Sequence, residues 1–255
     1  MKAVILAAGR GSRLAPLTDR CPKPMIPVGG RPLLEHVVNL LVGHGFDEIA
    51  INLHHLADRI SDHFGDGSAW GASIHYSTEE NLLGTAGAVK RITASLGKFT
   101  DLDEPLLVYY GDNLCNVDLT ALWSQHRRTG ALATLGLLWM DDPTTRGIIG
   151  LDADGRIDRL VEKPRPEQVF DDYLVNGGIY ALEPALLRHV PDGDPSDFAA
   201  DVFPALLAEG HPLYGHRLQG HLLSTDTPER YDHARARVDE GLFPLPPRAA
   251  AQERP

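Results

Sequence analysis

The chain has few cysteines and fewer basic than acidic residues. Its 255 residues include two cysteines, Cys21 and Cys115, too few for the disulfide framework of a small secreted protein. The net charge is −11, from 24 lysines and arginines against 35 aspartates and glutamates. Because a nucleic-acid backbone is bound by a basic surface, this balance argues against nucleic acid as the main partner. It leaves open a nucleotide ligand, which needs only a few local cations.

Long apolar runs are also absent. No stretch approaches the roughly 18 apolar residues that a membrane-spanning helix requires. The N-terminal run MKAVILAAGRGSR ends in glycine and arginine and lacks the apolar length and the cleavage site of a signal peptide. We therefore expect no membrane partner and a cytoplasmic location. The apolar fraction of 43% is that of an ordinary globular protein.

Zinc motifs are missing although the chain has 12 histidines. It contains neither HExxH nor a paired CxxC. His54 and His55 are adjacent, with no third ligand at helical spacing. We interpret the histidines as surface or core residues.

The first half shows a regular alternation of short apolar runs and helical patterns. Strands are expected over residues 2–6, 48–52, 73–77, 106–110 and 132–140, and helices over 31–41, 56–64, 85–96 and 119–128. This alternation predicts an α/β fold in which a mostly parallel central sheet carries helices on both faces. In such sheets, ligands bind outside the carboxyl ends of the strands.

After about residue 140 the pattern changes. Segments 146–152 and 156–162 flank an Asp-Gly turn signal and predict a hairpin. Another strand is expected over 178–182, and helices over 198–209 and 228–240. We interpret this half as an insertion that forms a substrate-binding wall and returns to the sheet near Leu222.

The loop after the first expected strand is suited to an anionic ligand. Gly9 and Gly11 let the backbone approach such a ligand and turn its N–H groups toward it, and Arg10 and Arg13 add positive charge. The spacing is similar to a dinucleotide fingerprint, but Leu14 replaces the third glycine, and no Walker lysine follows. The pair of glycines alone is equally typical of a tight turn.

A framed lysine follows this loop. Lys23 lies between Pro22 and Pro24, and proline restricts both its own backbone and that of the residue before it. We expect Lys23 to project from a stiff, extended segment, which suits a polyphosphate cradle.

These motifs resemble those of a known family. The run GRGSRLAPLT, followed by CPKPMIPVGGRPLLEH, resembles the signature of the sugar-1-phosphate nucleotidyltransferases, which include mannose-1-phosphate guanylyltransferases and glucose-1-phosphate thymidylyltransferases. The pieces LLGTAGAV, YYGDN, VEKP, VNGGIY and STDTPERY follow in order, so the resemblance covers nearly the whole chain.

The resemblance implies a Rossmann-like fold with a small sugar-binding insertion. It also implies an in-line displacement: a sugar 1-phosphate oxygen attacks the α-phosphorus of a nucleoside triphosphate, Mg²⁺ bridges the phosphates, and pyrophosphate leaves. We expect one nucleotidyltransferase domain over 1–240, with a nucleotide-binding part at 1–140 and a sugar-binding part at 141–220. Residues 241–255, rich in proline and alanine, are expected to form a mobile tail.

The resemblance also implies roles for individual residues. Arg13 stabilises the departing pyrophosphate with its bidentate guanidinium, Lys23 contacts the phosphates, and Lys163 holds the sugar phosphate. With Asp112, these form the implied catalytic set. The implied nucleotide-binding residues are Leu6, Ala8, Gly9, Gly11, Ser12, Arg13, Lys23, Glu79, Gly84, Thr85, Gly87 and Asp112. Those implied for the sugar phosphate are Gly147, Glu162, Lys163 and Asn176.

Glu79 or its neighbour Glu80 is a candidate acceptor for the N1 and N2 hydrogens of guanine. A carboxylate before a helix also commonly caps it, so this role stays open.

The implied Mg²⁺ ligands are Asp112 and Asp226. Mg²⁺ prefers one or two carboxylates together with substrate phosphates and water. The family's second aspartate aligns without gaps on Ser224, a poor Mg²⁺ ligand, whereas Asp226 directly precedes Thr-Pro as in other relatives. Asp226 also suits a helix N-cap, so both alternatives remain.

Several readings of function remain open. We expect a nucleotidyltransferase that uses GTP, with a dTTP- or UTP-dependent member of the same family as the alternative. A catalytically inactive regulatory relative would be expected to lose the charged phosphate contacts, which are all present here. A glycosyltransferase of similar fold would carry Asp-x-Asp, where this chain has Leu114. Family members often form dimers or tetramers, which is compatible with a homo-oligomer, and we expect a stand-alone transferase without a fused second domain.

Overall fold

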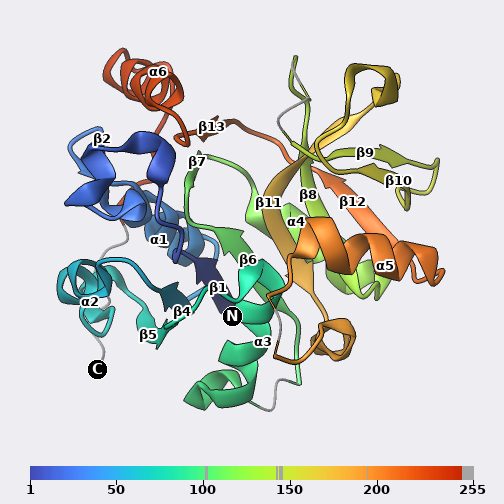
Figure 1. The fold of residues 1–255 in the computed structure, drawn as a ribbon, viewed down its shortest axis with the longest axis horizontal. Coiled ribbons are helices and arrows are strands. Elements are labelled where there is room, and N and C mark those ends of the chain that lie inside the picture. The colour runs from blue at the N-terminus through green and yellow to red at the C-terminus, as the bar shows by residue number, and fades with distance from the viewer. Residues whose placement is uncertain (101–102, 142, 144–145, 194, 249–255) are drawn as a thin grey trace.

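The computed structural model describes residues 1–100, 103–141, 143, 146–193 and 195–248 (Figure 1). At its centre lies a nine-stranded sheet with the strand order β10-β9-β11-β6-β1-β4-β5, to which β8 is added beside β11 and β12 beside β8. The predicted α/β fold with a central sheet between helices is confirmed.

The first-half strands of the sheet are parallel. They are β1 (Lys2–Leu6), β4 (Glu48–Leu53), β5 (Ser73–Thr78) and β6 (Leu106–Tyr110). In register, Val4 of β1 lies opposite Ala50 on one side and Val108 on the other. All of these strands therefore end at the same edge, where the loops after them can share one site.

The second half supplies strands of both directions. The strands are β8 (Ala133–Leu138), β9 (Ile148–Leu151), β10 (Ile157–Val161), β11 (Leu174–Leu182) and β12 (Leu213–Arg217). β9 and β10 form the predicted antiparallel hairpin, and β11 is antiparallel to both β6 and β8. β12, which the sequence pattern does not predict, pairs parallel to β8. The second half is thus part of the central sheet as well as a wall beside it.

Helices cover both faces of the sheet because its strands are apolar on both sides. Ile5 belongs to the core under α1 (Leu33–Gly43), α2 (Ala57–Phe64) and α4 (Leu119–Thr129). Its neighbour Val4 points the other way, into the core under α3 (Gly84–Ser95) and α5 (Phe203–Ala208). A π-helical turn, η8 (Phe198–Val202), leads directly into α5. None of the described helices has the length and apolar character to cross a bilayer.

A small second sheet brings the end of the chain back to the middle. β7 (Asn113–Cys115) pairs antiparallel with β13 (Leu222–Ser224), and Ser224 lies opposite Asn113. The return predicted near Leu222 is therefore to β7 and not to the central sheet. α6 (Pro228–Asp239) follows β13.

The first part of the predicted mobile tail is packed. Phe243 is 4% exposed and lies in a small apolar cluster with Leu14, Ile26 and Tyr231, against which Leu245 also packs. This part differs from the predicted mobile tail, because Phe243 is buried and Leu245 is partly buried despite the proline-rich composition. Residues 249–255 lie outside the described residues.

Two predictions near the N-terminus need correction. Residues Arg31–Pro32 pair with Pro27–Val28, so the helix expected from residue 31 begins at Leu33. Lys23 begins a single 3₁₀ turn (Lys23–Met25) and not an extended segment. That turn forms because the Met25 N–H donates to the Pro22 carbonyl, at 2.7 Å.

Candidate functional site

Two cavities adjoin each other at the carboxyl ends of the parallel strands. One has a volume of about 350 Å³ and the other of about 340 Å³. Four residues belong to the walls of both: Arg13, Tyr110, Asp112 and Asp197. Ligands in the two cavities would therefore meet at these side chains. We call them the first and the second cavity.

The first cavity brings together nearly all the residues predicted to bind nucleotide. Its wall includes the following predicted residues: Leu6, Ala8, Gly9, Gly11, Ser12, Arg13, Lys23, Glu79, Gly84, Thr85 and Asp112. Most of this wall comes from the loop after β1 and from the start of α3.

Gly11 shows why this loop is glycine-rich. Its φ is +63°, in the left-handed region, and a Cβ there would lie 2.9 Å from Lys23 Cβ. The hydroxyl of Thr18 donates to the Gly11 carbonyl at 2.9 Å. The missing side chain thus lets the lysine-bearing turn pack directly on the loop.

Lys23 is directed at Asp112. The Lys23 side chain is 8% exposed, and its Nζ lies 2.7 Å from Asp112 Oδ2. Asp112 is 42% exposed, so its carboxylate faces the cavities while the lysine is buried behind it. A cation held this close to the boundary between the cavities can neutralise charge on a phosphate ligand there.

Glu79 has a structural role in this wall. Its Oε1 accepts from Asn52 Nδ2 at 2.8 Å, and its Oε2 accepts from the Leu83 N–H at 3.0 Å. Asn52 in turn accepts from the Ala7 N–H at 2.6 Å. These bonds tie the ends of β1 and β4 to the segment before α3. Glu79 lines the cavity, and Glu80 is exposed.

The start of α3 packs against a distant segment. Gly84 has φ +73°, and a Cβ on it would overlap the backbone of Ser196. The N–H groups of Ala86 and Gly87 donate to the Ser196 carbonyl, at 2.9 and 3.3 Å. Gly87 is not among the residues that line the first cavity within the described part of the chain. Its amide binds protein, so the predicted contact of Gly87 with nucleotide stays a prediction.

The second cavity gathers the residues predicted to hold the sugar phosphate. Gly147, Glu162, Lys163 and Asn176 all belong to its wall. A Cβ at Gly147 would overlap the Glu162 carboxylate, so glycine lets that carboxylate point into the cavity. Lys163 has φ +46°, a left-handed conformation that is costly for lysine and typical of functional sites.

Asn176 and Glu162 are held in different ways. The side-chain oxygen of Asn176 accepts from the Gly178 N–H at 2.9 Å and from the Tyr180 hydroxyl at 3.0 Å, which fixes the plane of the amide. Burial raises the pKa of the Glu162 carboxyl, against the opposing charges of Lys163 and Arg146.

Several wall residues were not predicted. Arg146 enters the second cavity and donates to the Asn176 carbonyl and to Asn113 Oδ1, both at 3.2 Å. Asp197 accepts from the Thr85 hydroxyl at 2.8 Å and lines both cavities. Asp197 also caps η8, so its Asp-Phe sequence resembles an ordinary helix start. No spacing signal links either residue to the motifs before it.

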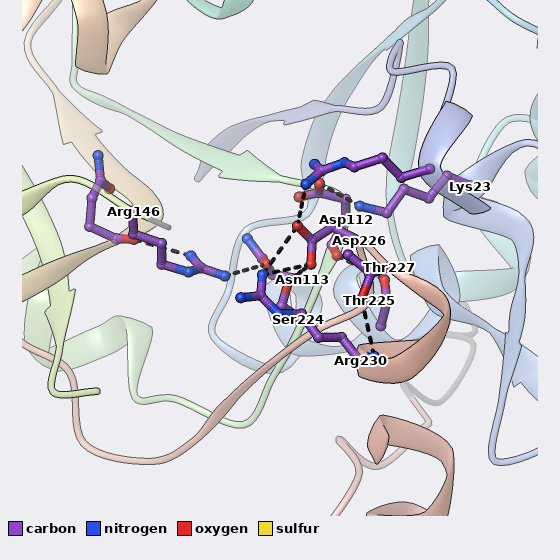
Figure 2. A network of polar contacts seen from close by, with 11 residues as sticks. Lys23, Asp112, Asn113, Arg146, Ser224, Thr225, Asp226, Thr227 and Arg230 are labelled. Carbon is purple, nitrogen blue, oxygen red and sulfur yellow. Dashed lines mark hydrogen bonds and ion pairs between the residues drawn. The ribbon is translucent and has the colours of Figure 1, made fainter. Parts of the chain in front are cut away.

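The small β7–β13 sheet brings the two predicted metal ligands together (Figure 2). The hydroxyl of Thr225, which is fully buried, donates to the Asp112 carbonyl at 3.1 Å. Asp226 follows directly, and both aspartates line the second cavity. Two residues far apart in sequence are thus fixed as neighbours.

Asp226 is surrounded by donors. Ser224 Oγ donates to Asp226 Oδ1 at 2.6 Å, Arg230 NH1 lies 3.0 Å from the same oxygen, and Arg13 NH1 lies 2.9 Å from Oδ2. Burial alone would raise the pKa of Asp226, but these hydrogen bonds and charges hold it well below its usual range.

The structure bears on the two alternatives left open for Asp226 and Ser224. The N-cap of α6 is Thr227, whose hydroxyl accepts from the Arg230 N–H at 3.3 Å, so Asp226 is not the cap. Ser224 lines the second cavity together with Asp226 and donates to it.

The parallel strands, with two adjoining cavities at their carboxyl ends, define an α/β protein built like those that bind nucleotides. Residues 2–222 match the family described as nucleotidyl transferase, and the chain belongs to that family. The resemblance drawn from the N-terminal signature is thereby confirmed.

Curated relatives of the chain act on different nucleotides. A UTP–glucose-1-phosphate uridylyltransferase of Synechocystis is 38% identical over 225 residues, which cover 84% of this chain and 57% of that protein. A mannose-1-phosphate guanylyltransferase of Mycobacterium tuberculosis is 34% identical over 248 residues, covering 96% of this chain and 66% of that protein. The chain therefore spans about three fifths to two thirds of the length of these relatives.

Solved structures share the fold. A Bacillus anthracis protein assigned as a glucose-1-phosphate thymidylyltransferase, in complex with sucrose, superposes with a TM-score of 0.80 at 25% identity, over 92% of this chain and 94% of that one. HddC of Yersinia pseudotuberculosis, complexed with GMP-PN, gives a TM-score of 0.73 at 24% identity, over 93% of this chain and 99% of that one.

Proposed function

We propose that this protein joins a sugar 1-phosphate to a nucleoside triphosphate, forming a nucleoside diphosphate sugar and pyrophosphate. The observation that carries the proposal is the shared wall of the two cavities. A nucleotide in the first cavity and a sugar phosphate in the second would bring their phosphates together at Arg13 and Asp112. Family membership supports the same reaction class.

In this reaction the protein positions and neutralises charge. Lys163, at the wall of the second cavity, would hold the phosphate of the sugar so that its oxygen faces the α-phosphorus. Lys23 and Arg13, on the far side, would neutralise the charge that develops as the bond to pyrophosphate breaks. Glu162 and Asn176 would accept and donate hydrogen bonds to the sugar hydroxyls.

The residues at the boundary fit Mg²⁺. Asp112 and Asp226 offer carboxylate oxygens, the hard donors that this ion prefers. When bound, Mg²⁺ would supply positive charge that neutralises the phosphates. Arg13, which is 68% exposed and paired with Asp226, is free to turn from that carboxylate toward a phosphate.

For the nucleotide we propose GTP, with UTP as the second candidate. The guanylyltransferase relative aligns with 96% of this chain, which favours GTP. UTP is favoured by the uridylyltransferase relative and by the bonding of Glu79, because both of its oxygens already accept hydrogen bonds from the protein.

The decisive experiment is a matrix of pyrophosphate-release assays with Mg²⁺. Each of GTP, UTP, dTTP, ATP and CTP is combined with a panel of sugar 1-phosphates. Release with GTP and one sugar phosphate supports the proposal in full, and release with UTP selects the second candidate. If nucleotide binds but no pair releases pyrophosphate, the enzymatic proposal is wrong and a regulatory relative is indicated.

A further inference from the structure

Three side chains outside both cavities converge on one point of the surface. Glu209 Oε2 lies 3.5 Å from His189 Nδ1 and 3.4 Å from His211 Nε2. One ligand atom from each of the three lies within 4.8 Å of the others. We propose that His189, Glu209 and His211 form a binding site for a transition-metal cation of the Zn²⁺ type, separate from the proposed Mg²⁺ site.

The distances are close to those of a formed site. Zn²⁺ binds imidazole nitrogen and carboxylate oxygen at about 2.0–2.2 Å, so two ligands of a tetrahedral ion lie about 3.3–3.5 Å apart. The distances from Glu209 Oε2 to His189 Nδ1 and to His211 Nε2 both fall at this value. Glu209 thus needs little movement to share an ion with either histidine. Nitrogen and oxygen ligands of this kind favour Zn²⁺ and similar ions over Mg²⁺.

The backbone fixes two of the ligands relative to each other. α5 ends at Ala208, and Gly210 follows with φ +81°. In this turn the Gly210 N–H donates to Leu207 and the His211 N–H donates to Leu206, at 3.0 and 2.9 Å. This C-terminal helix motif sets Glu209 and His211 on either side of a glycine that tolerates the left-handed conformation.

His189 comes from a different element and completes the group. It ends the 3₁₀ segment η7 (Pro184–His189), and the next residue, Val190, is 2% exposed and anchored in the core. The His189 and His211 rings lie 4.9 Å apart, centroid to centroid, at an angle of 73°. The nearby cation Lys90 is paired with Asp192 at 2.6 Å, so its charge is compensated.

The site is accessible to an ion and leaves room for water. The three side chains are between one third and just over one half exposed. Three protein ligands plus one solvent ligand make up a four-coordinate zinc site. The cluster also contains a carboxylate, which favours a cation.

The position of the cluster suggests a structural role. His189 precedes, and Glu209 and His211 follow, the segment that carries Asp197, a wall residue of both cavities. A shared metal ion would join the two ends of that segment and restrict its movement. Bound Zn²⁺ should therefore stabilise the folded protein, since the unfolded chain does not hold the three ligands together.

The test is a Zn²⁺ titration of the EDTA-treated, dialysed protein in the presence of excess Mg²⁺, followed by calorimetry. Co²⁺ in place of Zn²⁺ should give the visible absorption of a tetrahedral nitrogen–oxygen site. We expect one equivalent of Zn²⁺ to be lost in each of His189→Ala, Glu209→Gln and His211→Ala. In each variant the affinity for Zn²⁺ should fall by more than the factor of about 10–100 that loss of an outer-shell partner causes. In the wild type, Zn²⁺ at about 100 times its Kd should raise the unfolding midpoint by about 5–10 °C.

His233→Ala provides the matched control, because His233 is an exposed histidine on α6, away from the cluster. It should keep the wild-type stoichiometry, the Co²⁺ spectrum and the thermal shift. The proposal is overturned if the three cluster variants bind Zn²⁺ as the wild type does, or if the wild type binds none. Because these readouts do not depend on turnover, they stay separate from the test of the transferase reaction.

Discussion

The walls of the two cavities consist of different kinds of residue. The wall of the first comes mainly from backbone and small residues of two short segments, the loop after β1 and the start of α3. The wall of the second comes largely from charged side chains, most of them in segments that flank the strands and helices: Arg146, Glu162, Lys163, Asp197, Asp226 and Arg230. A backbone wall depends on glycine geometry, whereas a side-chain wall depends on charges brought together by the fold. Substitutions in the wall of the first cavity should therefore have different effects from substitutions in the wall of the second.

The largest effect is expected at the boundary between the two cavities. Lys23→Ala removes the buried cation beside Asp112 and should lower kcat by about 10²–10⁴-fold, in line with other groups that stabilise developing charge. Steady-state pyrophosphate release measures the loss. Lys98→Ala is the control, because Lys98 is a 63% exposed lysine paired with Glu48. A Lys23→Ala enzyme of near-normal rate would contradict the proposed mechanism.

The next effect tests the side-chain wall. Arg146→Gln should raise the KM for sugar 1-phosphate by about 10-fold or more, because a charged donor is lost from the second cavity. The KM for the nucleotide should change little. Arg159→Gln serves as the control, since Arg159 stacks on Phe170 at 4.3 Å and is not among the lining residues. Equal increases in both KM values would show that Arg146 does not act on the sugar phosphate alone, and would contradict the assignment of one ligand to each cavity.

A pair of glycine substitutions tests the backbone wall. Gly11→Ala should destabilise the fold by about 1–2 kcal/mol and raise the nucleotide KM, because Gly11 has φ +63° and its new Cβ would press on Lys23. At Gly9 a Cβ would meet nothing within 4 Å. Gly9→Ala should therefore keep its stability and raise only the nucleotide KM, by a smaller factor. Chemical denaturation and kinetics with varied nucleotide measure the two quantities, and equal stability loss in both variants would show that Gly11 is not constrained as described.

The smallest expected effect is on stability as a function of pH. The pKa of Asp226 is lower in the folded protein than in the unfolded chain, so its ion pairs stabilise the fold above the unfolded value of about 3.9 and are lost as pH falls below it. Asp226→Asn should thus be less stable than wild type at pH 7, by about 1 kcal/mol, and the gap should narrow below about pH 4. Asp232→Asn, on an exposed aspartate, should show no such gap. A difference that stays constant with pH would show that the ion pairs of Asp226 do not contribute.

The same contrast explains what the sequence could and could not predict. The parallel strands and the first cavity follow from apolar runs and from motifs within short segments, so Gly9, Gly11, Arg13 and Lys23 were identified correctly as neighbours. Arg146 and Asp197 reach their cavities only through tertiary packing, and nothing in their local sequence marks them. The three-residue strands β7 and β13 are too short to give a periodic signal, and the buried Phe243 lies in a segment whose composition indicates disorder.

The histidine cluster shows the same limit. His189 lies about twenty residues before Glu209 and His211, so no metal-binding spacing links them. The interpretation of every histidine as a surface or core residue followed from searching for local motifs. The turn at Gly210 and the end of η7 bring the three side chains together only in the folded chain.

The bond from Thr225 to the Asp112 carbonyl joins two positions 113 residues apart, so it can form only after β13 has been synthesised. The loop after β1, Lys23, the start of α3 and Asp112 all leave the ribosome before β13 does, so most of the wall of the first cavity is available early. Asp226 follows β13 in the chain and is therefore the later of the two proposed metal ligands to be synthesised. In terms of the proposed function, a growing chain would therefore contain most of the proposed nucleotide-binding residues before it contains the second proposed metal ligand.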